Sequence, residues 1–82
     1  MALSELEILS DIADILAEDA NVPVGSVRLS SRLDGDLGLD ASMKANVIGT
    51  VRTRFQVGVS DEEASKFATV GDIAAYLQAA IG

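Results

Sequence analysis

The spacing of apolar residues near the N-terminus predicts the first helix. These residues recur at intervals of three and four positions, the period of an amphipathic helix: Leu6, Leu9, Ile12, Ile15 and Leu16. Ser4 precedes them and Glu7 follows three residues later, which is the spacing of a capping box. The pattern predicts a helix from about Ser4 to Asp19. Three turn-forming residues then end it: Asn21, Pro23 and Gly25.

A second apolar stripe predicts a helix that begins after Asp40. Aspartate is a favoured N-cap residue, and its charge complements the positive end of the helix dipole. The stripe consists of Val47, Ile48, Val51 and Phe55. The helix therefore runs to about Phe55. Gly49 lies inside it and costs roughly 1 kcal/mol relative to alanine, which indicates either a close approach of another segment or a space that the glycine leaves open.

Two further helices are predicted towards the C-terminus. Ser60 caps the shorter one, with Glu63 as its partner in a capping box, and this helix ends near Phe67. Thr69 caps the longer one. Its apolar stripe consists of Val70, Ile73, Ala74, Leu77 and Ile81.

The segment from Ala20 to Leu39 has no regular period and is predicted to be a long loop, with a short helical turn near Ser26 to Leu29. Loops of this length in compact domains are often functional. Apolar residues can pin the loop to the helices: Val22, Val24, Val27, Leu29, Leu33, Leu37 and Leu39. The predicted fold is all-α, a four-helix bundle with three long helices, one short helix and a long first loop. Residues 1–82 are expected to form one domain.

Composition argues against several kinds of chemistry. The chain has no cysteine, so disulfides, thiol nucleophiles and thiolate metal sites are excluded. It has no histidine, which is the usual general base near neutral pH, and no convergent pair of acids is apparent. Asp34, Asp36 and Asp40 do not fit a calcium loop, because Leu39 and Ala45 occupy the positions of its required glycine and glutamate. The chain is therefore expected to be neither an enzyme nor a metal protein.

The net charge of the chain is −7, with six basic against thirteen acidic side chains. Nucleic-acid binding is not expected, because it requires lysine and arginine to displace counterions from phosphates. The sequence shows neither a signal peptide nor an apolar stretch near the roughly 20 residues that a bilayer requires. A cytoplasmic monomer is expected.

Two long segments resemble one protein family. Residues 36–55 read DLGLDASMKANVIGTVRTRF, and residues 60–77 read SDEEASKFATVGDIAAYL. Both are similar to acyl carrier proteins of fatty-acid and polyketide synthesis and to related peptidyl carriers, over nearly the whole chain. The resemblance implies a non-catalytic carrier of acyl, polyketide or aminoacyl groups. In the family, a serine at the start of the second helix receives 4′-phosphopantetheine from coenzyme A, and the thiol of this cofactor bears the cargo.

The resemblance breaks at the attachment serine. The family reads Gly-x-Asp-Ser-Leu, whereas here Gly38, Leu39 and Asp40 precede Ala41 and Ser42. Placing Ala41 at the serine position puts the apolar stripe of the second helix on the family's core positions. Placing Ser42 there fills these positions instead with Ile48, Gly49, Arg52 and Gln56, which breaks the stripe. Ala41 is therefore the favoured attachment position and Ser42 the second choice.

Alanine has no nucleophilic oxygen, so Ala41 would leave the chain in its unmodified form. We hypothesise that Ala41 is an engineered replacement of a native serine; a natural carrier homologue without serine is the alternative. A second function class also remains open, a helical interaction domain that keeps the carrier fold without a prosthetic group. The resemblance further implies that Asp40 helps to orient the phosphopantetheinyl transferase and its metal.

The second helix lacks the acidic surface that the family usually presents to partner enzymes. Its outer face contains Ser42, Asn46, Thr50 and Thr53, with Met43 and Arg54 at the edge. We expect partners to recognise this helix by apolar and polar contacts more than by charge pairing. The residues predicted for the motif and for partner recognition are Gly38, Leu39, Asp40, Ser42, Met43, Asn46 and Arg54. Lys44 is expected to lie towards the core stripe with its ammonium group extended to water.

The family resemblance also implies a cavity between the helices for an acyl chain, and a set of partners. The residues expected to line this cavity are Val47, Ile48, Val51, Phe55, Phe67 and Ile73. The implied partners are a phosphopantetheinyl transferase, an acyl or aminoacyl ligase or an acyltransferase, and downstream synthase enzymes.

Overall fold

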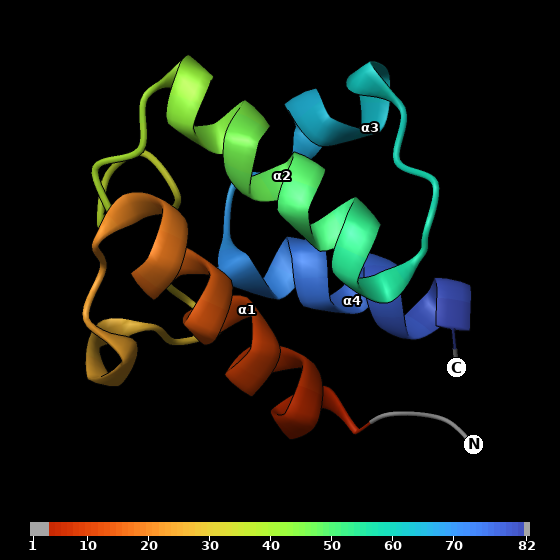
Figure 1. The fold of residues 1–82 in the computed structure, drawn as a ribbon, viewed down its shortest axis with the longest axis horizontal. Coiled ribbons are helices and arrows are strands. Elements are labelled where there is room, and N and C mark those ends of the chain that lie inside the picture. The colour runs from red at the N-terminus through yellow and green to blue at the C-terminus, as the bar shows by residue number, and fades with distance from the viewer. Residues whose placement is uncertain (1–3, 82) are drawn as a thin grey trace.

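The computed structural model describes residues 4–81 and confirms the predicted all-α architecture. The helices are α1 (Glu5–Ala20), α2 (Ala41–Phe55), α3 (Asp61–Lys66) and α4 (Val70–Ile81), with a short 3₁₀ helix, η1, at Val24–Ser26. Figure 1 shows that the long first loop covers one end of the bundle, while α2 lies across α4 with the short α3 beside it. Helix α1 packs against both α2 and α4.

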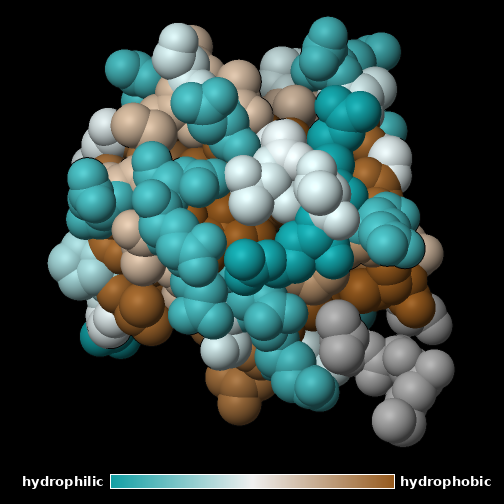
Figure 2. Space-filling view, viewed as in Figure 1, coloured by the Kyte–Doolittle hydropathy of each residue, from teal (hydrophilic) through white to brown (hydrophobic). Residues whose placement is uncertain are grey.

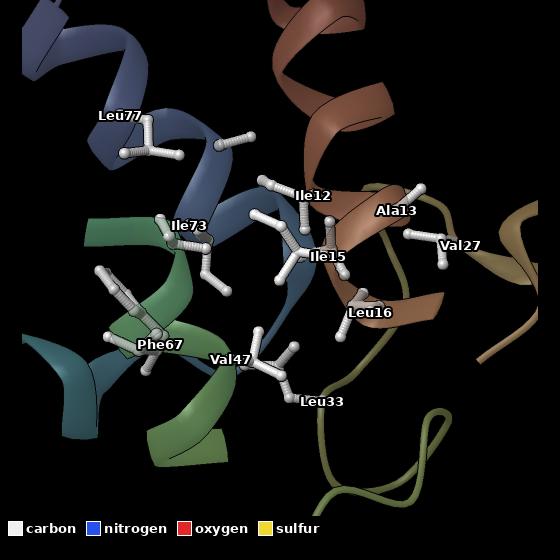
Figure 3. Packing of buried hydrophobic residues seen from close by; sticks show 14 of the residues in the cluster. Ile12, Ala13, Ile15, Leu16, Val27, Leu33, Val47, Phe67, Ile73 and Leu77 are labelled. Carbon is white, nitrogen blue, oxygen red and sulfur yellow. The ribbon is translucent and has the colours of Figure 1, made fainter. Parts of the chain in front are cut away.

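The core is formed by the faces on which the apolar stripes were predicted, except at the start of α1. There the prediction was wrong for Leu6, which is 75% exposed, and Ile8, which was not predicted, is fully buried. Figure 3 shows aliphatic side chains from α1, α2 and α4 meeting in one packed cluster, with Phe67 at one side of it. Residues exposed by no more than 2% of their surface include Ile8, Ile12, Ile15, Leu16, Val47, Val51, Val70, Ile73 and Leu77. Because aliphatic side chains fill this space, dispersion and the removal of apolar surface from water supply most of the stabilisation.

Local capping explains where the helices begin. Both halves of the predicted box at α1 are present: the Glu7 N–H donates to Ser4 Oγ, and the Ser4 N–H donates to Glu7 Oε1. At α3, the Glu63 N–H donates to Ser60 Oγ as predicted. The first turn of α4 adds a carboxylate that the sequence analysis did not predict as a cap. Asp72 Oδ2 accepts hydrogen bonds from the Ala68 and Thr69 N–H groups, while the Asp72 N–H donates to Thr69 Oγ1.

The long loop is held against the start of α4 by backbone hydrogen bonds. The Leu33 N–H donates to the Ala68 carbonyl, and the Val70 and Gly71 N–H groups donate to the carbonyls of Ser31 and Leu29. This contact is close: a Cβ added at Gly71 would lie 2.8 Å from the Leu29 carbonyl oxygen. The predicted helical turn of the loop is present but lies slightly earlier in the chain, as η1, because Pro23 fixes φ at −59° just before it.

The structure distinguishes between the two explanations given above for a glycine at position 49, a close approach of another segment and an open space. A Cβ at this position would meet nothing within 4 Å, so no segment of residues 4–81 approaches α2 closely there. The glycine leaves open space on the outer surface of α2. It does not border the hollows beside position 41 that are described below.

Candidate functional site

The candidate attachment position lies at the first turn of α2. Asp40 is the N-cap residue, and its Oδ1 accepts a hydrogen bond of 2.8 Å from the Met43 N–H. Ala41 is the first helical residue and Ser42 the second, and both are exposed. A helix N-terminus presents free amide hydrogens and a partial positive charge, so both residues lie where an anionic group is favoured.

A tight turn before α2 positions this end of the helix. The Leu37 N–H donates to the Arg32 carbonyl, and the Leu39 N–H donates to the Leu33 carbonyl. Gly38 has φ of +69°, a conformation that side chains with a Cβ rarely adopt, so the turn favours glycine here. Leu39 is buried and therefore anchors the residue next to the cap. Gly38 and Leu39 thus have structural roles, and the recognition role expected for them stays a prediction.

Burial on α2 follows the phase predicted for the apolar stripe. Val47, Ile48 and Val51 are buried, and Phe55 is half-buried against the core. Of the four positions that the competing register would place in the core, Ile48 is buried, whereas Gly49, Arg52 and Gln56 are exposed. This is the arrangement expected if Ala41, and not Ser42, occupies the serine position of the family.

The outer surface of α2 is polar along most of its length. Ser42, Asn46 and Thr53 are exposed, whereas Met43 is half-buried against the core. Figure 2 shows weakly hydrophobic atoms over the first turns of α2 and pale atoms of intermediate hydropathy farther along it. None of the residues Ala41–Phe55 is acidic.

Two residues on the edge of α2 contact α1. The Thr50 hydroxyl donates a hydrogen bond of 2.6 Å to Asp19 Oδ2, and the Arg54 guanidinium lies 3.5 Å from Glu18 Oε2. Arg54 was predicted to contact partners, and the structure shows that it already contacts the end of α1. The prediction that Thr50 lies on the outer face of the helix was wrong, because Thr50 is partly buried against Asp19. Nothing local in the sequence relates two residues so far apart in the chain.

Two hollows border position 41. The first, of about 360 Å³, lies between α2 and α3 and is lined by Ala41, Lys44, Ala45, Ile48, Asp61, Ala64 and Ser65. The second, of about 310 Å³, lies on the loop side and is lined by Leu33, Asp34, Leu39, Asp40, Ala41, Lys44, Ser65, Phe67 and Ala68. Lys44 is half-buried and borders both, in line with its predicted direction. The sequence did not indicate Ala45, Ala64 or Ser65, because their role depends on how α3 packs.

The residues expected to line an acyl cavity belong to the packed core or lie against it. Ile48 borders the first hollow, and Phe67 borders the second. Val47, Val51 and Ile73 are buried within the packed core, and Phe55 packs against its edge. The open space next to position 41 therefore lies beside the core, between α2 and α3 and on the loop side of α2.

The side chain at position 41 determines whether a group can be attached there covalently through a phosphodiester. The Ala41 side chain is a methyl group and has no oxygen with which to form a phosphodiester, so this residue does not fit such a group. The adjacent Ser42 has a hydroxyl and is exposed. Within residues 4–81 no three side chains of the metal-binding types gather into a possible ion site. In the same residues no helix is long and apolar enough to cross a membrane.

A family model and several individual proteins that resemble this chain all indicate the same family. A sequence model of a protein family, described as "Phosphopantetheine attachment site", matches residues 10–77. A protein of Beutenbergia cavernae named acyl carrier protein is 34% identical over 80 residues, which cover 98% of each chain. Proteins of the same name from Kineococcus radiotolerans and Wolinella succinogenes are 34% and 33% identical, over 96% and 89% of this chain and 98% and 96% of their own.

Proposed function

The chain belongs to the acyl carrier protein family, and on this premise we propose that a serine at position 41 would let it carry acyl groups on 4′-phosphopantetheine. This prosthetic group supplies a terminal thiol, to which the cargo is joined as a thioester. Proteins of this family are carriers and not catalysts, and they work with transferase and synthase enzymes. For this chain we propose a cytoplasmic monomer, a cargo from fatty-acid or secondary-metabolite synthesis, and loading by an acyl or aminoacyl ligase or an acyltransferase.

The observation that carries the proposal is the position of residue 41. It is the first residue of α2, it is exposed, and Asp40 caps the helix directly before it. A transferring enzyme can therefore reach it, and the dipole of α2 favours a phosphate there. The buried stripe of Val47, Ile48 and Val51 is in phase with this assignment. Asp40, which caps the helix through Met43, is also proposed to help orient the transferase and its metal.

Ala41 keeps this form of the chain unmodified in our proposal. Replacing a serine by alanine at an exposed first helical position removes the nucleophile and little else, because no packing depends on the hydroxyl. The same alanine favours a second candidate function, a carrier-fold interaction domain that never receives the group. The two candidates differ in whether restoring the hydroxyl is sufficient for modification.

Intact mass spectrometry distinguishes the two candidate functions. The chain and its Ala41→Ser variant are each incubated with coenzyme A and a transferase of broad specificity. We expect the variant to gain the mass of one phosphopantetheine and the parent chain to remain unchanged. A mass gain by the parent would make Ser42 the site, which a Ser42→Ala variant would verify. Failure of the Ala41→Ser variant would favour the interaction domain.

A further inference from the structure

A third hollow lies on the C-terminal half of α2, away from position 41. It has a volume of about 520 Å³ and is lined by Gly49, Arg52, Thr53, Gln56, Val57 and Gly58. Val57 is its only large apolar residue. Thr53 Oγ1 donates to the Gly49 carbonyl within the helix, so the Thr53 oxygen remains free to accept a hydrogen bond.

Two residues that border this hollow are unfavourable for local stability. Gly49 lies inside a helix, and no described residue packs so closely that a side chain would be excluded there. Gln56 ends α2 with φ of +55°, the left-handed conformation of a helix C-cap, which glycine adopts at lower energy. Residues that weaken the fold without an internal reason tend to occur at functional sites. Contact of this surface with another molecule would explain why these two residues occur here.

Arg52 supplies the charge of the hollow. Its side chain is exposed, and none of the three ion pairs formed by residues 4–81 includes it. Helix α2 has no acidic residue that could neutralise it. A cation in the last turn of a helix complements the helix dipole, which explains a positive charge at this position. The dipole does not explain why open space at Gly49 adjoins that charge.

We propose that this hollow is a docking seat for an aspartate or glutamate side chain of a partner protein. A guanidinium group binds a carboxylate through parallel hydrogen bonds, and the missing side chain at Gly49 gives that carboxylate room to approach the helix. The molecule contains a precedent, since Arg54, on the same helix, already pairs with Glu18 of α1. The seat adds a partner surface to the proposed function and does not depend on the prosthetic group.

NMR titration of the chain with a small carboxylate probe tests the seat directly. The probe is acetyl-Glu-Glu-amide, and the matched neutral probe is acetyl-Gln-Gln-amide. We expect the acidic peptide to produce saturable shifts in the amide signals of Gly49, Gln56 and Gly58 and in the side-chain N–H signal of Arg52. These shifts should weaken as salt is added, and the neutral peptide should not produce them.

Three variants provide the controls. Arg52→Gln should abolish the response, and Gly49→Leu should abolish it by filling the hollow while Arg52 remains. Arg28→Gln removes the same charge from an exposed residue of the long loop and should preserve the response. Equal shifts with both peptides, or an unchanged response in Arg52→Gln, would overturn the proposal. Because the titration needs no phosphopantetheine, its failure leaves the proposed carrier function untouched.

Discussion

The hydroxyl of Thr50 donates a 2.6 Å hydrogen bond to the carboxylate of Asp19, and this contact joins the end of α1 to the edge of α2. Thr50 also donates to the Asn46 carbonyl of its own helix at 3.1 Å. Both Thr50 and Asp19 are partly buried. The contact fixes the side of α2 that faces α1 and leaves the opposite side of the helix, with Ala41 and Arg52, free.

Thr50→Val should therefore lower the free energy of unfolding by about 1 kcal/mol, because a hydrogen bond to a charged, partly buried carboxylate is lost. Urea denaturation followed by circular dichroism measures this difference. Thr53→Val is the matched control, since the Thr53 hydroxyl donates only within α2 and is exposed. An equal effect of both substitutions would show that the contact with Asp19 does not stabilise the fold.

Leu33 should be the loop residue on which stability depends most. It is 2% exposed, and its N–H also donates to the Ala68 carbonyl. Leu33→Ala should lower the free energy of unfolding by about 2–5 kcal/mol, as for other buried leucines. Leu6 is 75% exposed on α1, so Leu6→Ala should change the free energy by no more than about 0.5 kcal/mol. Thermal unfolding measures the loss of stability in each of the two variants. A small loss in Leu33→Ala would mean that the loop is not part of the core.

Two glycine substitutions should act in opposite directions. Gly71→Ala places a Cβ 2.8 Å from the Leu29 carbonyl oxygen and should cost about 1–3 kcal/mol by forcing the loop away from α4. Gly49→Ala meets nothing within 4 Å and should raise the free energy of unfolding by about 1 kcal/mol, because alanine favours the helix. Differential scanning calorimetry shows whether each substitution raises or lowers the stability of the fold. Destabilisation by Gly49→Ala would contradict the open space described on α2.

Asp72 should make stability depend on pH in the acidic range. The N–H group of Ala68, followed by that of Thr69, donates to its carboxylate and lowers the pKa of Asp72 below the ordinary value of 3.8. A lowered pKa stabilises the fold above the unfolded-state value, and this contribution is lost as the pH falls through the folded-state pKa. The stability advantage of the parent chain over Asp72→Asn should thus shrink with acidification. Urea titrations at several pH values measure it, and a constant difference across the range would refute this account.

The four helices could be predicted because their signals are local. The spacing of Ile12, Ile15 and Leu16, and caps such as Ser4 and Asp40, depend only on residues within one or two helical turns. The path of the long loop could not be predicted. It depends on backbone hydrogen bonds such as the one from the Leu33 N–H to the Ala68 carbonyl, which joins residues far apart in the chain and leaves no periodic pattern.

The candidate site was only partly predictable for the same reason. Helix phase alone placed Ala41 at the exposed start of α2, and the burial of Val47 and Val51 agrees with that phase. The hollow beside Ala41 depends on how α3 packs on α2 through residues such as Ala64, and neither helix determines that packing alone. The acyl cavity expected by resemblance stays a prediction, and the hollows next to position 41 lie beside the packed core.

The double variant Ala41→Ser, Ser42→Ala gives the most direct test of the carrier assignment, because position 41 then holds the only hydroxyl at the start of α2. The variant is incubated with coenzyme A and a transferase, with an acyl carrier protein known to be modified by that transferase in the same reaction, and its peptides are mapped by mass spectrometry. The account predicts one phosphopantetheine on residue 41. An unmodified variant beside a fully modified control carrier would contradict it.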